Sequence, residues 1–180
     1  MAAICVFCAS SRTLDKRWLA LAREVGTELA ARGHRLVSGG GCVGMMGAVA
    51  QAARAGGAHT LGVIPQSLVD LEVADRDADE LIVTTDMASR KTLMMDKADA
   101  FLVLPGGLGT MDELFEVWTT AILGMHAKRT VLLDTDGFYA GLVEWLEVAV
   151  EERFVQARAL STLRIVQTVD RALDVIERVD

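Results

Sequence analysis

The chain has 180 residues, a formal net charge of −7 at pH 7, 52% hydrophobic residues and a mean hydropathy of +0.33. This length and apolar content suit a single domain over residues 1–180 and exclude an intrinsically disordered chain. The acidic balance argues against a nucleic-acid surface. No apolar run approaches the roughly 20 residues that span a bilayer, so we expect a cytoplasmic protein with no membrane partner.

Short apolar runs alternate with helical patterns along the whole chain. Seven runs are predicted as strands: 4–8, 35–38, 60–64, 81–84, 100–104, 130–133 and 163–166. Several are apolar at every position, which is typical of parallel strands covered on both faces. Helical spacing of apolar residues lies between them, and the last helix is expected to start at Thr168. The pattern predicts an α/β fold with a single-domain, Rossmann-like, doubly wound and mostly parallel sheet, with helices on both faces.

Cys5 and Cys8 form a C-x-x-C pattern, which could indicate redox chemistry or a zinc site. In a strand, however, positions i and i+3 point to opposite faces, and no second Cys/His pair is present to complete a zinc site. We therefore expect no metal.

The first glycine-rich stretch is SGGGCVGMMG, in which Gly39, Gly41 and Gly44 match G-x-G-x-x-G. The stretch follows the second predicted strand rather than the first, and no acid ends the next strand, so a dinucleotide site is not indicated. Two interpretations stay open. The loop and the following helix bind an anion, or the glycines permit a tight turn and close packing. On the first, the residues supporting a phosphate are Ser10, Gly39, Gly40, Gly41 and Gly44.

The segment 66–79 carries five acids and is expected to be a solvated loop for most of them. Arg90 and Lys91 follow at the start of a predicted helix, where cations are unfavourable for the helix dipole. They are interpreted as ligand contacts, with ordinary solvated side chains as the alternative.

The second glycine-rich stretch is LPGGLGTMDE. Pro105 ends a buried strand, and Thr110 to Glu113 match a capping box in which Glu113 reaches back to the cap amide. Alternatively, Glu113 faces an uncharged or developing-positive part of a ligand, such as a ribose. Because ligands bind at the carboxyl ends of parallel strands, both glycine loops are expected to face one ligand.

PGGLGTMDE resembles the PGGxGTxxE signature of the Lonely Guy (LOG) phosphoribohydrolases, a family often labelled "possible lysine decarboxylase". MASRK, SGGGCVGMMG and VIPQSLVDLE are similar to further elements of that family. The resemblance runs from the first strand to about Tyr139. It implies a Rossmann-like homodimer with no cofactor, which hydrolyses AMP and N6-modified (cytokinin) AMP to a free base and ribose 5-phosphate.

The resemblance also implies a set of site residues, with Arg90 and Glu113 as the catalytic pair. The substrate residues it implies are Glu72, Arg90, Lys91, Gly106, Gly107, Leu108, Gly109, Thr110, Met111, Asp112, Glu113 and Thr119. Whether Arg90 grips the phosphate or orients Glu113 stays open, as does the choice between adenine and a prenylated adenine. Ala88 and Ser89 depart from the family pattern and bear on specificity and turnover.

Two other functions are compatible with parts of the pattern. One is a non-catalytic nucleotide or molybdenum-cofactor carrier, which is distinguished by the absence of base release from AMP. The other is a decarboxylase, which would need a Schiff-base lysine for pyridoxal phosphate. Lys16, Lys91, Lys97 and Lys128 offer no such setting.

Overall fold

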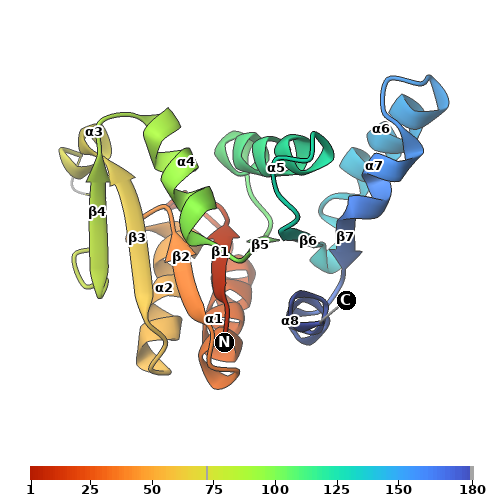
Figure 1. Cartoon of the computed structure of the whole chain (residues 1–180). Coiled ribbons are helices and arrows are strands. Elements are labelled where there is room, and N and C mark those ends of the chain that lie inside the picture. The colour runs from red at the N-terminus through yellow and green to blue at the C-terminus, as the bar shows by residue number, and fades with distance from the viewer. Residues whose placement is uncertain (72, 179–180) are drawn as a thin grey trace.

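A computed structural model describes residues 1–71 and 73–178. Seven strands form one sheet in the order β4-β3-β2-β1-β5-β6-β7, and every neighbouring pair is parallel (Figure 1). The strands are β1 (Ala3–Phe7), β2 (Arg35–Ser38), β3 (Thr60–Pro65), β4 (Glu80–Thr84), β5 (Ala100–Val103), β6 (Arg129–Leu133) and β7 (Leu163–Val166).

Helices cover both faces of the sheet, as the buried apolar strands require. They are α1 (Lys16–Ala31), α2 (Gly44–Ala55), α3 (Gln66–Val69), α4 (Met87–Lys97), α5 (Leu108–Ile122), α6 (Ala140–Glu151), α7 (Ala157–Thr162) and α8 (Val169–Glu177). One core cluster joins the sheet to α1, α2 and α8, and the other joins it to α4, α5 and α6. Cys5 and Cys8 lie in different clusters, so the prediction that they face opposite sides is confirmed.

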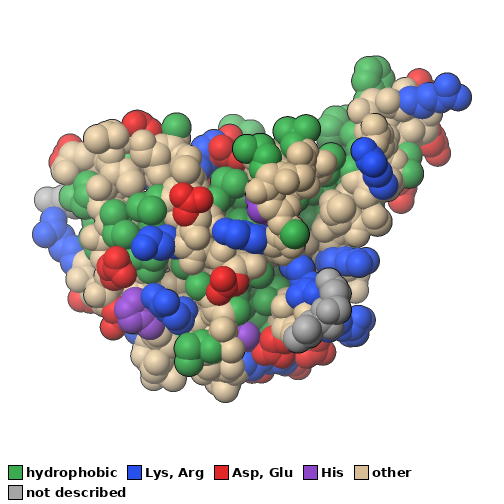
Figure 2. Space-filling view, viewed as in Figure 1, with side chains coloured by type: hydrophobic (Ala, Val, Ile, Leu, Met, Phe, Trp, Pro, Cys, Tyr) green, Lys and Arg blue, Asp and Glu red, His purple; other side chains and the backbone are tan. Residues whose placement is uncertain are grey.

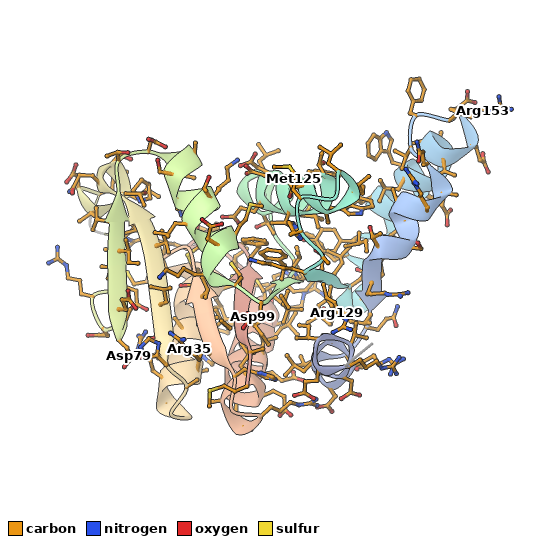
Figure 3. The ribbon with its side chains drawn as sticks, in the orientation of Figure 1. Arg35, Asp79, Asp99, Met125, Arg129 and Arg153 are labelled. Carbon is orange, nitrogen blue, oxygen red and sulfur yellow. The ribbon has the colours of Figure 1, made fainter. Side chains whose placement is uncertain are left out.

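The strand order places a topological switch point between β1 and β5. The chain winds outward from β1 to β4, then returns to the other side of β1 with β5. The connections that leave β1 and β5 therefore diverge and leave a crevice at the carboxyl edge of the sheet, where ligands of such folds bind. Figure 3 shows Arg35, Asp79, Asp99 and Arg129 at the opposite, amino-terminal edge.

The predicted α/β fold is confirmed, and each predicted strand agrees with the structure to within one residue at either end. The last helix begins at Val169, and the Thr168 side chain caps it by accepting a hydrogen bond from the Arg171 amide. Among the described residues, no helix is both long and apolar enough to cross a bilayer.

One local prediction is wrong. The helix that carries Arg90 begins at Met87, because the Asp86 side chain caps it through the Ser89 amide, so Arg90 is its fourth residue. In the acid-rich segment 66–79, Asp70, Asp77 and Asp79 are exposed, so the expectation that most of its acids are solvated is confirmed. The segment starts with the short α3, and it contains Asp75, whose carboxylate is buried and paired with Arg54.

Candidate active site

A cavity of about 540 Å³ opens at the carboxyl edge of the sheet. Its polar lining comes from the β1–α1 loop, α4 and the start of α5: Ser10, Ser11, Arg12, Arg90, Thr110 and Glu113. Its apolar lining comes mainly from α2, β3, the segment after β3 and α4: Met46, Ile64, Leu68, Leu71, Val73 and Met87. Gly39 and Gly41 of the first glycine loop and Gly107 and Gly109 of the second also line it, so both loops face one cavity as predicted.

Arg90 lies on the floor of the cavity with a side chain that is 6% exposed. Its Nε donates to the Val63 carbonyl at 3.1 Å, and its Nη2 donates to the Gly39 carbonyl at 3.3 Å. A Cβ at position 39 would collide with the guanidinium, so the glycine there is needed for this approach. The backbone at the ends of β2 and β3 therefore holds Arg90 in one orientation.

Glu113 is the acidic partner of Arg90, with 3.3 Å between Oε1 of Glu113 and Nη1 of Arg90. Burial raises the pKa of Glu113 to about 7, although the charge of Arg90 opposes this. A buried carboxyl that titrates near neutral pH beside a fixed cation, in a cavity, is the usual signature of a functional acid or base.

The capping-box interpretation of Glu113 is wrong. Helix α5 begins at Leu108 with Gly107 at its N-cap, and no side chain caps it. Thr110 is therefore already inside the helix, where its side chain packs so closely on Gly106 that a Cβ at 106 would collide with it. Glu113 is the sixth helical residue, so capping does not explain a carboxylate at this position.

The uncapped start of α5 leaves backbone donors at the cavity wall. The first amide of this helix to be paired is that of Met111, which donates to the Gly107 carbonyl. Within the described chain, the amides of Leu108, Gly109 and Thr110 have no acceptor. Free amides at a helix N-terminus, together with the helix dipole, favour a bound anion.

The first glycine loop is different, because its amides are mostly used within the protein. Gly40 donates to Ser38 Oγ, Gly41 to Met46 Sδ and Cys42 to the Val73 carbonyl. At the start of α2, both Met45 and Met46 donate to the Ala9 carbonyl. Gly44 has a positive φ and sits so tightly against Ser10 and Ser11 that no side chain would fit. This loop shapes the cavity chiefly through close packing.

Several residues that the resemblance implies lie outside the cavity lining: Gly106, Lys91, Met111, Asp112 and Thr119. Gly40 and Gly44, expected to support a phosphate in the first glycine loop, also lie outside it. Lys91 Nζ contacts Asp112 at 2.9 Å and Glu116 at 2.6 Å on the outer side of α4 and α5. Hydrogen bonds to these two carboxylates raise the pKa of Lys91, and the bond to Glu116 has the larger effect. Thr119 is exposed on α5, two turns beyond Asp112. Glu72 lies outside the described residues.

Sequence reasoning missed Arg12 and the apolar wall formed by Leu68, Leu71 and Val73. Arg12 lies a few residues after the end of the first strand. This position at the carboxyl end of a parallel strand could have identified Arg12 as a ligand-binding candidate. Arg12 has no ion-pair partner within residues 1–71 and 73–178. For the wall, the available signal was the stretch VIPQSLVDLE, which resembles a family element and contains Leu68 and Leu71.

Comparison with known proteins gives the chain a family. A family model described as "Possible lysine decarboxylase" matches residues 46–176. The chain is 51% identical to a cytokinin riboside 5'-monophosphate phosphoribohydrolase of Mycobacterium tuberculosis, over 94% of this chain and 90% of that protein. It is 42% identical to one of Arabidopsis thaliana, over 98% of this chain and 80% of that protein.

Solved structures share the fold at lower identity. The molybdenum cofactor binding protein of Rippkaea orientalis has a TM-score of 0.74 at 20% identity, covering 97% of this chain and 94% of its own. The molybdenum cofactor carrier protein of Chlamydomonas reinhardtii has a TM-score of 0.71 at 22% identity, covering 97% and 95%. Likeness at this level shows the fold alone. On the family model and the sequence identities together, the chain belongs to the Lonely Guy (LOG) family, whose model is described as "Possible lysine decarboxylase".

Proposed function

We propose that this chain hydrolyses the N-glycosidic bond of nucleoside 5'-monophosphates, AMP and N6-modified AMP, to a free base and ribose 5-phosphate. The observation that carries the proposal is the buried Arg90–Glu113 pair beside the free amides of α5. The cavity of about 540 Å³ has the size of a small-molecule site. The relatives at 51% and 42% identity are named for this reaction.

The 5'-phosphate is placed at the start of α5. There the amides of Leu108, Gly109 and Thr110 offer donors that need no rearrangement, and the positive end of the helix dipole favours the anion. Arg12 and Ser10 lie on the same cavity lining and add a cation and a hydroxyl. The phosphate thus anchors the substrate at one end.

The ribose is placed over Glu113, one and a half turns along the same helix. Cleavage passes through an oxocarbenium-like ring, and an ionised carboxylate stabilises the positive charge that develops there. Glu113 also accepts a proton from the water whose oxygen bonds to C1'. The base departs with the electrons of the C1'–N bond and takes up a proton from solvent, so that neutral base is released. Arg90 keeps the carboxylate oriented, because its other nitrogens are bound to the Val63 and Gly39 carbonyls.

The base is placed against the apolar wall formed by Leu68, Leu71 and Val73, with Met46 and Met87 nearby. The resemblance implies that Glu72 also contacts the nucleotide, and we retain it in the proposed substrate site. An apolar wall suits both a purine ring and an N6 substituent.

We also propose a homodimer formed through the exposed side of α5. Leu108, Leu123 and Met125 are exposed large apolar residues at the two ends of this helix. Figure 2 shows hydrophobic side chains over α5, and Figure 3 labels Met125 beside this helix. Asp112 and Thr119, which the resemblance places in the substrate site, lie exposed on the same helix. A sedimentation mass of one 19.4 kDa chain would contradict this proposal.

A cytoplasmic location is proposed on the state of the cysteines. Cys5, Cys8 and Cys42 are all free, as is usual in a reducing compartment.

The decarboxylase description of the family model does not suit Lys91, a lysine whose charge acts on Glu113. A Schiff-base lysine must lose its charge to act as a nucleophile. Asp112 and Glu116 instead stabilise the charged ammonium of Lys91.

The test of the proposed function is whether cleavage depends on the 5'-phosphate. We expect kcat/KM for AMP to exceed that for adenosine by at least roughly 100-fold, because several charge-assisted hydrogen bonds to the phosphate are lost with the nucleoside. Chromatography of adenine released from each substrate measures this. Equal kcat/KM values would contradict the phosphate site, and AMP binding without release of adenine would favour a non-catalytic carrier.

The proposal also predicts how the rate depends on pH. Glu113 must be ionised to act, so kcat is expected to fall as the pH drops through about 7. Asp112 raises the pKa of Glu113 and Lys91 lowers it, since both charges lie close by. Asp112→Asn should therefore move the acidic limb to lower pH, and Lys91→Met should move it to higher pH. If kcat falls over the same pH range in the wild type, Asp112→Asn and Lys91→Met, a group other than Glu113 controls the pH dependence of kcat.

A further inference from the structure

Helix α2 carries a buried ion pair that the proposed chemistry does not use. Arg54, in the last turn of α2, contacts Asp75 through two hydrogen bonds, Nη1 to Oδ2 at 2.7 Å and Nη2 to Oδ1 at 3.1 Å. The side chains are 19% and 6% exposed. A two-pronged guanidinium–carboxylate contact at low exposure fixes geometry as well as charge.

Asp75 belongs to the segment 73–77, which runs beside the first glycine loop. The Asp75 amide donates to the Gly40 carbonyl at 2.8 Å, and the Cys42 amide donates to the Val73 carbonyl at 2.8 Å. Gly41 and Ala74 form an antiparallel bridge between them. The glycine loop is therefore the platform on which this segment lies, and this contact uses the Cys42 amide of the loop.

The segment lines two adjoining cavities. Val73 lines the proposed active site together with Leu68 and Leu71. Asp75 and Asp77 line a second cavity of about 410 Å³ on the other side, where Arg54 also lies. The ion pair lies outside the lining of the proposed active site and supports the segment that carries Val73 from the side of the second cavity.

We infer that the Arg54–Asp75 pair is a positioning device for the wall that contacts the base, and that it sets affinity for the base end of the substrate without taking part in bond cleavage. This inference rests on the proposed function. The Arg90–Glu113 pair and the free amides belong to α4 and α5, which the segment 73–77 does not carry. The glycine loop has its own supports, since Gly40 donates to Ser38 Oγ and packs against Val63 and Ile64.

The expected result is a split between KM and kcat. Arg54→Met keeps the apolar stem of the side chain and removes the charged fork, so the wall shifts while α2 persists. We expect KM for AMP to rise about tenfold, equivalent to ~1.4 kcal/mol of lost base contact, with kcat changed less than about threefold. The inhibition constant of ribose 5-phosphate, which lacks the base, should stay at its wild-type value. Asp75→Asn should show the same split, and the double variant should be no worse than either single one.

Arg32→Met is the matched control. Arg32 is 20% exposed, lines neither cavity and contacts four carboxylates, those of Glu28, Asp170, Asp174 and Glu177. We expect it to lower the melting temperature while leaving KM for AMP unchanged. If Arg54→Met behaves in the same way, its role is structural only and the inference is overturned. A fall in kcat at unchanged KM would overturn it as well.

The failure of the proposed function can be told apart from the failure of this inference. If the wild-type protein releases no adenine, calorimetric titration replaces the kinetics, with AMP and ribose 5-phosphate as the two ligands. Weaker binding of AMP but not of ribose 5-phosphate by Arg54→Met then supports the inference and rejects the hydrolase. Binding of AMP that is equal in both proteins, or absent from the wild type, overturns the inference.

Discussion

Replacing Glu113 by glutamine is expected to lower kcat for AMP by at least roughly 100-fold while AMP still binds. The amide keeps the shape of the side chain but carries no charge to stabilise the oxocarbenium-like ring and cannot accept a proton from water. Because α5 begins at Leu108, Glu113 has no capping role that would offer another explanation for such a loss. Single-turnover release of adenine, with AMP binding measured separately, checks both halves of the result.

The stability of this variant is a second readout with a defined sign. Burial raises the pKa of Glu113 from 4.5 to about 7, so the folded protein holds the proton more tightly than the unfolded chain. Folding stability is therefore lost as the pH rises between these values, by a few kcal/mol at most. Glutamine resembles the protonated form. At pH 8 we therefore expect Glu113→Gln to melt at the wild-type temperature or above it. A buried charge that is needed for activity lowers folding stability, and the substitution removes that charge.

Asp112→Asn is the matched control for Glu113→Gln. It removes a carboxylate from the adjacent residue, about 100° around the helix, where the side chain is 57% exposed and contacts Lys91 rather than the cavity. We expect a change in kcat of less than about tenfold at pH 8. Comparable kcat values for Glu113→Gln and wild type would mean that another residue supplies the catalytic carboxylate.

Replacing Arg90 by lysine is the second change with a large expected effect, a loss of kcat of roughly 100-fold. The guanidinium points three nitrogens at three partners, the Val63 carbonyl, the Gly39 carbonyl and the Glu113 carboxylate. A single ammonium on a flexible stem cannot reproduce that fork. Glu113 then loses its fixed orientation, and a shift of about 1 Å in a catalytic group is enough for such a loss.

The Arg90→Lys experiment needs evidence that the fold survives. Circular dichroism and an unchanged strand and helix content supply it, and Arg32→Lys gives the effect of the same substitution at a multidentate site remote from the cavity. Turnover at the wild-type level in Arg90→Lys would show that only a point charge is required. If Arg90→Lys turns over slowly but binds ribose 5-phosphate as the wild type does, Arg90 acts by orienting Glu113 rather than by binding the phosphate.

Local sequence patterns were sufficient to predict the strands and the fold class. The apolar run 100–104 is buried on both faces, in agreement with the predicted strand at the centre of a parallel sheet. Glycine stretches after two of these strands indicated ligand loops, since the carboxyl ends of parallel strands share one edge. Both loops do line one cavity.

Helix boundaries were less well determined, and this affected the candidate site. Thr110 and Asp112–Glu113 match a capping box, but the helix begins two residues before Thr110 at Leu108, so the first turn is uncapped. The capping motif in the sequence predicts one possible first residue for α5. The observed first residue depends on the packing of Thr110 on Gly106, which is set by the way β5 leads into α5. Because α5 begins at Leu108 without a side-chain cap, the amides of Leu108, Gly109 and Thr110 are free.

The sequence by itself determined which residues form the strands, where the glycine loops lie and that Arg90 and Glu113 are candidates. Only the tertiary structure decided what those residues contact. The order β4-β3-β2-β1-β5 brings the ends of β2 and β3 under α4, so Arg90 is seated on Gly39 and Val63, which lie far from it in the chain. Burial by the same packing raises the pKa of Glu113, and it joins Arg54 to Asp75 across 21 residues. Periodicity is a property of neighbouring residues, whereas burial and charge pairing depend on which distant segments the sheet order places side by side.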